Sequence, residues 1–233
     1  SAPSLTAGRT TTLTSSISTL TSTGSITLTS RNFSSNNNNP LFYLQSGTLT
    51  CTDVTTVHPS GTNTATISLT TGAATGTLKL TGATPFTLDT DGTNSITLNG
   101  SGATVEYSGT AQTVRNTSYT NLTLSGSGNK TLAAFSISGT LSIQGSAVGI
   151  TTAPTFGAGS TLEFKNVGTK TTNAIEWPAS SGPSNLIIDN SGSIVTMPVS
   201  SARTLSGNLT LTAGTLADAG NILTVQGNIA GTG

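Results

Sequence analysis

A short strand-like phrase returns along the chain and constrains its fold more than any other feature of the sequence. The phrase reads Gly-Thr-Leu-Lys-Leu at Gly76, Gly-Thr-Leu-Ser-Ile at Gly139 and Gly-Asn-Leu-Thr-Leu at Gly207. Its alternation of apolar and polar residues is typical of a β-strand with one buried face. Repetition of such a phrase indicates a protein built from stacked repeats, which is long and stiff.

The spacing of the phrases favours coils of several short strands over a β-sandwich. Successive phrases start 18 to 29 residues apart, whereas sandwich strands recur about every 8–12 residues. The starts are Ser25, Gly47, Gly76, Ala103, Asn121, Gly139, Ser160, Asn185, Gly207 and Gly227. No segment has helical periodicity over three turns. We predict an all-β fold, a β-solenoid (parallel β-helix) of about ten coils, with tandem β-sandwich domains as the alternative.

A longer repeat contains several of these phrases. Gly76 and Gly139 lie 63 residues apart, and the two copies close with similar triplets, Lys130-Thr-Leu132 and Arg203-Thr-Leu205. We therefore divide the regular solenoid, residues 76–233, into units 76–138, 139–206 and a partial unit 207–233. Residues 29–75 are predicted to form irregular first coils with an Asn-rich loop, and residues 1–28 an N-terminal arm or a capping or connecting strand.

The charge composition argues against two classes of partner. Charged residues make up 7% of the chain, against roughly 25% in ordinary globular proteins. Eight Lys and Arg residues balance eight Asp and Glu residues, so the clustered positive charge of a nucleic-acid-binding surface is missing. The same lack of clustered positive charge argues against an anionic membrane surface as a partner. A net charge near zero removes long-range repulsion and favours self-association.

The single cysteine and the single histidine do not indicate a reactive centre. Cys51 alternates with Leu49 in a strand phrase, which favours a buried thiol, with an intermolecular disulfide as the alternative. His58 precedes Pro59 and is predicted to be a solvated loop residue. No apolar run reaches the roughly 18 residues that a membrane-spanning helix needs. No secretion signal is visible at Ser1, so an exported protein would appear here as a processed form or a fragment.

The carboxylates do not form the cluster that a carbohydrate-active enzyme needs. Asp89 and Asp91 resemble part of a calcium loop, but the closing bidentate Glu is missing, which favours a simple turn. Glu106 and Glu163 occupy equivalent positions of the longer repeat. Eight carboxylates scattered along the chain predict a protein that is not an enzyme. We expect no catalytic, cofactor-binding or metal-binding residue.

Aromatic and threonine residues offer two further alternatives. Trp177, Tyr107 and Tyr119 could stack on sugars, although a corner position is favoured for Trp177. Threonines at alternate positions, as at Thr210 and Thr212, lie on one strand face and would resemble an ice-binding ladder if the coils were identical. The unequal spacing of the phrases argues against ice binding, so we expect the threonines to solvate the outer face while Leu faces inward.

Two longer phrases, residues 103–114 and 119–132, resemble the repeats of Ser/Thr/Gly-rich bacterial surface and secreted proteins with adhesin-like β-solenoids. The resemblance covers residues 47–233 and is compositional and structural, so it transfers no functional residue. It implies display at the cell surface or in the extracellular space. It also implies adhesive or scaffolding work.

We therefore expect a structural extracellular protein, the subunit of a surface fibre or the shaft of an adhesin. Leu78, Leu141 and Leu209 are predicted to occupy equivalent buried positions. The coil that begins at Gly227 is unfinished at Gly233, so its open edge is expected to pair with residues 4–28 of another copy, unless the chain is a truncated shaft. The expected partner is thus another copy, with cell-surface glycans as a second possibility. A carbohydrate-binding module is the main alternative, and ice binding or a polysaccharide-active enzyme is less favoured.

Overall fold

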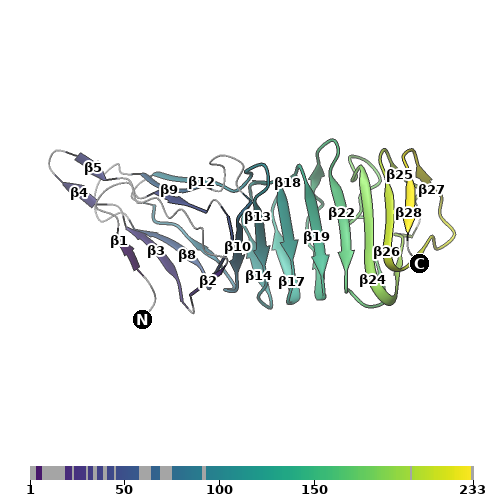
Figure 1. Ribbon diagram of the computed structural model, residues 1–233, viewed down its shortest axis with the longest axis horizontal. Helices are drawn as coiled ribbons and strands as arrows, with labels where there is room; N and C mark the ends of the chain where they lie inside the picture. The colour runs from purple at the N-terminus through teal and green to yellow at the C-terminus, as the bar shows by residue number, and fades with distance from the viewer. Residues whose placement is uncertain are drawn as a thin grey trace. The chain divides into compact units, whose positions relative to one another are not determined.

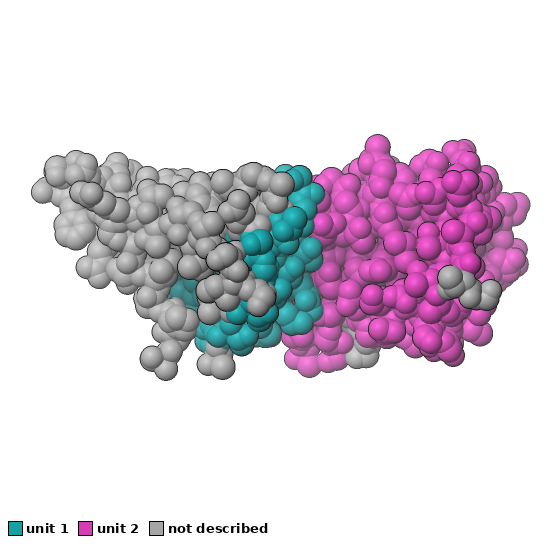
Figure 2. All heavy atoms as spheres, viewed as in Figure 1, with its two compact units in different colours: residues 1–106 teal, residues 107–233 magenta. Residues whose placement is uncertain are grey.

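The structure is a computed structural model that describes most of the chain. The described residues are 4–6, 19–22, 24–29, 31–33, 36–38, 41–44, 46–57, 64–68, 75–90, 93–199 and 201–231. They form two compact units, residues 1–106 and 107–233, which Figure 2 shows in different colours. The boundary between residues 106 and 107 does not coincide with the start of any repeat unit predicted from the sequence.

All regular elements of the described residues are β-strands. Unit 1 contains β1 (Ser4–Thr6), β2 (Thr19–Thr21), β3 (Ile26–Thr29), β4 (Arg31–Phe33), β5 (Asn36–Asn38), β6 (Leu41–Tyr43), β7 (Thr48–Cys51), β8 (Val54–Val57), β9 (Thr64–Ser68), β10 (Thr77–Leu80), β11 (Phe86–Thr87) and β12 (Thr93–Thr97). The boundary falls within β13 (Thr104–Tyr107).

Unit 2 contains the remaining strands. They are β14 (Gln112–Val114), β15 (Ser118–Tyr119), β16 (Asn121–Leu124), β17 (Ser127–Leu132), β18 (Ser136–Ile137), β19 (Thr140–Gln144), β20 (Ser146–Ile150), β21 (Thr155–Phe156), β22 (Thr161–Lys165), β23 (Lys170–Thr171), β24 (Asn185–Thr196), β25 (Arg203–Leu205), β26 (Leu209–Ala217), β27 (Leu223–Val225) and β28 (Ile229–Gly231).

Unit 2 is a parallel β-solenoid. Its largest sheet stacks β16, β19, β22, β24, β26 and β28 in sequence order. Figure 1 shows β19, β22, β24 and β26 side by side in this order. The other strands stack in smaller parallel sheets, β14-β17-β20, β15-β18-β21 and β25-β27. The all-β solenoid fold predicted from the phrase spacing is therefore confirmed, with about six turns. The count of ten coils stays a prediction.

A column of aliphatic side chains runs through the coils of unit 2 because the recurrent phrases stack in register. Leu141 lies over Leu122, and each later coil adds one apolar residue to the same column. The added residues are Leu162, Leu186, Leu209 and Ile229. Leu141 and Leu209 are buried, as predicted, and so is Leu78 in the corresponding strand of unit 1.

Unit 1 stacks its strands in the same parallel way. Its sheets contain β2-β7-β10, β1-β3-β8-β11 and β12-β9-β6, and β4 and β5 form an antiparallel pair within the predicted Asn-rich loop. The phrase at Ser25 forms β3, which pairs with β1 and β8 and so does not join the sheet of the later phrases. In that sheet the place before β7 is taken by β2, which aligns Leu20 with Leu49. Both segments alternate correctly, so only the pairing distinguishes them.

The described strands of residues 1–28 are therefore part of the sheets of unit 1. β1 pairs with β3, and β2 pairs with β7. Alternation along the regular strands places Leu, Val or Cys inward and Thr outward, as in β7, where Leu49 and Cys51 are buried and Thr48 and Thr50 are half-buried. This arrangement agrees with the role expected for the threonines.

Candidate functional site

The column of aliphatic residues ends at an exposed strand. Leu162 and Leu186 are fully buried and Leu209 is 6% exposed, but Ile229, the next residue of the column, is 67% exposed. Ile222, near β27, is 70% exposed. Within the described residues, β28 pairs with β26 alone. The end of unit 2 therefore presents both apolar side chains and a strand edge that can accept another strand.

Asparagine side chains link successive coils next to this column. The Asn185 Oδ1 atom accepts a hydrogen bond of 2.8 Å from the backbone N–H of Asn208. The Asn208 Oδ1 atom accepts one of 2.8 Å from the N–H of Asn228. Asn121 accepts a similar bond of 3.0 Å from the N–H of Thr140. The carboxamide of one coil thus fixes the backbone at the start of the next strand.

Each of these asparagines is covered by a glycine of the next coil. A β-carbon at Gly139 would lie 2.6 Å from Asn121 Oδ1, and one at Gly227 would lie 2.5 Å from Asn208 Oδ1. The Asn185 carboxamide excludes a β-carbon at Gly207 in the same way. The glycines that open the recurrent phrase therefore make room for the asparagine below.

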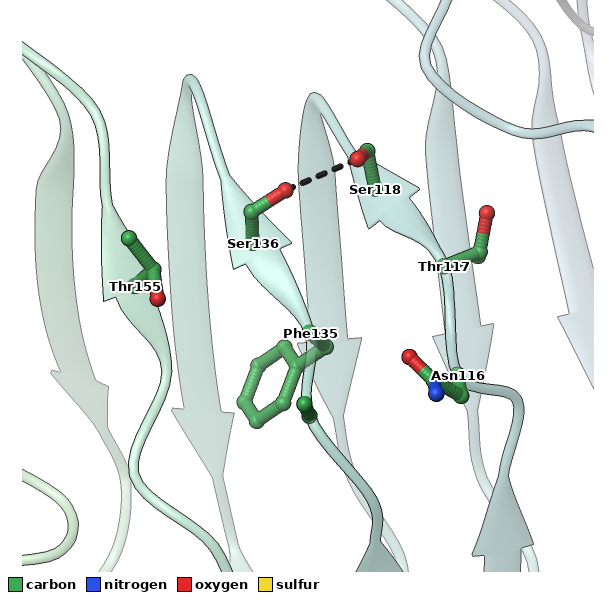
Figure 3. A pocket seen from close by; sticks show the side chains of 7 residues that line it. Asn116, Thr117, Ser118, Phe135, Ser136 and Thr155 are labelled. Carbon is green, nitrogen blue, oxygen red and sulfur yellow. Dashed lines mark hydrogen bonds between the residues drawn. The ribbon is translucent and has the colours of Figure 1, made fainter.

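A shallow depression on unit 2 is the second candidate site. It has a volume of about 420 Å³. It is lined by Asn116, Thr117, Ser118, Ala134, Phe135, Ser136 and Thr155. Figure 3 shows Ser118, Ser136 and Thr155 presented by successive strands, with the Ser136 hydroxyl donating to Ser118 Oγ at 2.8 Å, or accepting from it. The lining has hydroxyl and amide groups and no ionisable group, so it suits a neutral polar ligand and not acid–base chemistry.

The aromatic residues that suggested sugar stacking are buried. Trp177 is 1% exposed, and Tyr107 and Tyr119 are fully buried. The two tyrosine hydroxyls lie 3.1 Å apart, and Tyr119 donates to the backbone oxygen of Arg115 at 2.7 Å. Burial raises the pKa of Tyr107 to about 12 and that of Tyr119 as well. The hypothesis that these rings form a sugar platform was wrong, because they pack inside the coil.

Trp177 lies in a corner segment that carries buried charges. The Glu176 carboxylate is fully buried and forms an ion pair of 2.8 Å with Lys170. The Arg203 guanidinium, 1% exposed, donates through Nε to the Trp177 carbonyl oxygen at 2.8 Å and through Nη1 to that of Ser201 at 3.0 Å. Burial lowers the pKa of Arg203. Both Glu176 oxygens and Arg203 Nη2 lack a partner with hydrogen-bond geometry among the described residues, so Glu176 and Lys170 interact through charge alone.

Lys130 is a second buried cation, and no carboxylate among the described residues forms an ion pair with its ammonium group. Its Nζ atom donates to the carbonyl oxygens of Gly109 and Thr110, at 2.7 and 3.0 Å, and to Gln112 Oε1 at 2.9 Å. Burial lowers the pKa of Lys130 to about 8. The ammonium is a donor to the Thr110 carbonyl and a second donor to that of Gly109, which also accepts a longer bond of 3.4 Å from the Ser127 N–H.

Sequence reasoning missed both buried cations, although a signal was present. Lys130 and Arg203 open the similar triplets that close the two long repeats, and each alternates with a buried leucine two residues later. Strand alternation places both cations on the inward face. Lys and Arg are rarely fully buried, so residue type argued against the position that alternation indicates.

The conspicuous carboxylates are engaged separately between neighbouring coils. Glu106 forms an ion pair of 2.7 Å with Lys79 in unit 1, and Asp189 forms one of 2.9 Å with Lys165 in unit 2. Glu163 accepts a hydrogen bond from the Ser142 hydroxyl. No group of three or more His, Cys, Asp or Glu residues within the described part of the chain could hold a metal ion. His58 and Asp91 lie outside the described residues, so their roles remain predictions.

Cys51 is buried, as the sequence predicted. Its side chain has no exposed surface, and burial, together with the nearby charge of Asp53, raises the pKa of the thiol to about 12. A thiol in this state is a poor nucleophile because the reactive thiolate is disfavoured.

The rows of threonines that align across neighbouring strands, here called threonine ranks, are interrupted by other residues. Thr48 pairs with Thr77, but Thr50 pairs with Lys79 on the same face. In unit 2, the rank that begins with Thr123 continues with Ser142, Glu163 and Ile187. These ranks do not form the regular hydroxyl array that lattice matching to ice would need.

Comparison of the chain with protein-family models, curated proteins and solved structures finds no match. In the part of the chain that the structure describes, no helix has the length and apolar character needed to cross a membrane.

Proposed function

We propose that this chain is a structural extracellular protein, the subunit of a surface fibre or the shaft of an adhesin, and that it assembles through β-strand edges. One observation carries the proposal. The buried leucine column of unit 2 continues in register to Ile229, which is 67% exposed on a strand that pairs on one side among the described residues. The proposed partner is another copy, joined head to tail.

Physical chemistry supports addition of a strand at this edge. An open strand edge offers backbone N–H and C=O groups to a new strand, and an apolar residue at the centre of that strand gains burial on pairing. Burial of one isoleucine side chain contributes about 1.5–3 kcal/mol. The net charge of the chain is zero, so long-range repulsion does not oppose stacking of copies.

The proposal includes the ten-coil count, display on a bacterial cell surface or in the surrounding medium, and the absence of enzymatic activity and cofactors. The ten-coil count is supported by the ten recurrent strands of the largest sheet. They are β2, β7, β10, β13, β16, β19, β22, β24, β26 and β28. The absence of enzymatic activity is supported by the carboxylates, which do not cluster. Glu106, Asp189 and Glu163 each interact with a different neighbouring side chain.

The test compares two substitutions of equally exposed side chains. Ile229→Lys places a charge on the open edge, whereas Val199→Lys places the same charge on a residue that is 66% exposed and lies outside the strands. Negative-stain electron microscopy and sedimentation velocity would measure assembly of the wild type and both variants. We expect fibres or oligomers with the wild type and Val199→Lys and monomers with Ile229→Lys. A monomeric wild type at high concentration, or assembly unaffected by Ile229→Lys, would contradict the proposal.

A second candidate function is binding of a neutral carbohydrate in the depression around Ser136. The observation that favours it is the uncharged hydroxyl and amide lining of that depression. The wild type would be applied to a glycan array beside Ser118→Arg, which fills the depression, and Thr113→Arg, an exposed control on β14. Binding lost only in Ser118→Arg supports this function, and an array without signal for the wild type contradicts it. A reducing-sugar assay on the bound glycans would detect hydrolysis and so test the non-enzymatic part of the proposal.

A further inference from the structure

We propose that Asn99 is a site of spontaneous chemical modification, at which the asparagine side chain cyclises onto the backbone nitrogen of Gly100 and is then hydrolysed to aspartate or isoaspartate. The sequence contains the Asn-Gly pair once. The pair lies in the corner between β12 and β13. This inference is independent of the proposed assembly and needs no partner chain.

The reaction uses only groups of the chain and water. The Gly100 nitrogen loses its proton and attacks Cγ of Asn99, and the carboxamide nitrogen leaves as ammonia, which closes a cyclic succinimide. Water then adds to one of the ring carbonyl groups and opens the ring. Opening at Cγ gives aspartate, and opening at the backbone carbonyl carbon of residue 99 gives isoaspartate. Ammonia is lost and water is added, so nothing is oxidised or reduced.

Glycine at position 100 favours this attack over the same reaction at other asparagines. Gly100 has no β-carbon beside its nitrogen, and a glycine backbone reaches conformations that other residues avoid. Asn185 and Asn208 are each followed by leucine, whose side chain hinders the approach of the nitrogen. Both of these carboxamides also accept backbone hydrogen bonds.

The structure leaves the two reacting groups of the corner unengaged. Asn99 is exposed, directly after the buried residue Leu98. The Gly100 carbonyl oxygen accepts a hydrogen bond of 3.0 Å from the N–H of Ala103, so the corner is held by the carbonyl group and not by the nitrogen. Within the described residues, neither the Asn99 carboxamide nor the Gly100 N–H group takes part in a hydrogen bond.

Asn190 is the contrasting case, in which the fold protects the side chain. It is 1% exposed, its Nδ2 atom donates to the Gly168 carbonyl oxygen at 2.7 Å, and its Oδ1 atom accepts from the Gly168 N–H at 3.2 Å. Rotation of this carboxamide toward the nitrogen of Ser191 would break both hydrogen bonds. We therefore expect Asn190 to react only after the chain unfolds.

Modification of Asn99 changes both charge and backbone. Each conversion adds one negative charge to a chain whose formal net charge is zero. Isoaspartate also lengthens the backbone by one carbon atom, just before the buried residue Ala103 and before Thr104, whose N–H donates to the Gly76 carbonyl oxygen at 3.0 Å. Isoaspartate therefore alters the path of the chain into β13, whereas aspartate alters the charge alone.

Peptide mapping by mass spectrometry tests the site. The native wild type, the variant Asn99→Gln and a free peptide with the sequence of residues 96–103 would be incubated in mildly alkaline water enriched in heavy oxygen. Glutamine keeps an exposed amide at this position but adds a methylene group, which disfavours closure of the ring. A sample of the wild type in urea would expose Asn190. Electron-transfer fragmentation distinguishes aspartate from isoaspartate.

We expect the native wild type to convert Asn99 to both products, with one labelled oxygen, at a rate within about tenfold of that of the free peptide. Asn99→Gln should lose the signal, and Asn190 should react in urea alone. A native rate more than about tenfold below that of the peptide would show that the small exposed surface of Gly100 protects the pair, and would overturn the proposal. Aspartate without isoaspartate would overturn the cyclic route. A signal that persists in Asn99→Gln would assign the reaction to another residue and overturn the site.

Discussion

The carboxamide oxygen of Asn208 accepts a hydrogen bond of 2.8 Å from the backbone N–H of Asn228, one coil further along the solenoid. This bond joins a side chain to a backbone, so it specifies register as well as adding stability. A slip of one residue would move the inward side chains to the outer face and break the asparagine contact. The glycine that precedes each such N–H also fixes the register, because a residue with a β-carbon would collide with the carboxamide.

The solenoid also uses buried cations where a corner of the coil leaves carbonyl groups inside. Lys130 donates to Gly109 and Thr110, and Arg203 donates to Trp177 and Ser201. Both cations take a place that an apolar residue would occupy in a plain strand. They supply donors to the backbone oxygens of irregular corner segments.

Gly207→Ala tests the fit between glycine and asparagine. The new β-carbon would collide with the Asn185 carboxamide, and overpacking of this kind costs about 1–3 kcal/mol. Gly207 does not have a positive φ, so its backbone conformation adds no separate penalty. The free energy of unfolding would be measured by urea denaturation.

The control for this prediction is the same change in an Asn185→Thr background. Threonine at this position leaves room for a β-carbon, as at Thr161 below Ser184. The cost of Gly207→Ala should therefore be smaller in that background, and the two substitutions should not be additive. Additive costs would show that the asparagine is not what requires glycine.

Leu162→Ala tests the apolar column. Leu162 is fully buried between Leu141 and Leu186, and such truncations cost about 2–5 kcal/mol through lost burial and a cavity. Ile194→Ala removes a similar side chain that is 43% exposed and lies outside this column. Thermal and urea denaturation should show a large loss of stability for Leu162→Ala and a much smaller one for Ile194→Ala. Equal losses would contradict the stacked register.

The sequence was sufficient to predict the regular coils. Gly139-Thr-Leu and Gly207-Asn-Leu combine alternation with a glycine start, and their leucines lie in the predicted column. It was also sufficient in principle to predict the burial of Tyr107, which alternates with Val105 in β13. The carbohydrate-binding alternative counted this ring among its exposed aromatics, which its burial contradicts.

Other features could not be predicted because they depend on pairing between distant strands. The segments at Thr19 and Ile26 alternate equally well, and only the contacts with β7 and β8 decide which sheet each joins. The corner that holds Trp177 has no strand periodicity, so its burial had to be inferred from size and polarity alone. The depression around Ser136 arises from three strands that lie 18 to 19 residues apart in sequence.

Cys51 should be unreactive in the folded chain and should make stability depend on alkaline pH. The pKa of the thiol rises from 9.0 to about 12 on folding, so the unfolded chain releases this proton first. Below pH 9, the thiol is protonated in both the folded and the unfolded chain, and its contribution to the free energy of unfolding is constant. As the pH rises from 9 toward 12, the free energy of unfolding falls by at most about 1.4 kcal/mol per pH unit. Between pH 9 and 10, Cys51→Ala should reduce this slope. Iodoacetamide should label Cys51 only after denaturation, and rapid labelling of the native chain would contradict its burial.

Lys130→Met should destabilise unit 2, because it removes one donor from each of the oxygens of Gly109, Thr110 and Gln112. Gly109 O keeps a long bond of 3.4 Å from the Ser127 N–H, and Gln112 Oε1 keeps the bond of 2.7 Å from the Gly109 N–H. Loss of one buried partner costs about 1–3 kcal/mol, and three acceptors are affected. The control, Lys165→Met, changes a side chain that is 41% exposed and should have an effect within about 0.5 kcal/mol.

Folding lowers the pKa of Lys130 from 10.5 to about 8, so the stability of the wild type relative to Lys130→Met should rise between pH 8 and 10.5. An unchanged free energy of unfolding would show that the carbonyl contacts are not important.

Arg203→Met should release the corner that contains Trp177. The guanidinium donates to the Trp177 carbonyl oxygen at 2.8 Å and to the carbonyl oxygens of Ser201 and Ala202 at 3.0 and 3.1 Å. Methionine keeps the apolar length of the side chain but removes all of these donors, so the corner backbone loses its fixed position.

Trp177 is the one tryptophan of the chain, and its fluorescence therefore reports on this corner directly. We expect a blue-shifted emission that acrylamide quenches poorly in the wild type, and a red-shifted, readily quenched emission in Arg203→Met. The control, Thr204→Met, alters an exposed residue of the same strand β25 and should leave the spectrum unchanged. A wild-type emission typical of solvated indole would contradict the burial of Trp177, and an unchanged spectrum in Arg203→Met would show that the corner is held by other contacts.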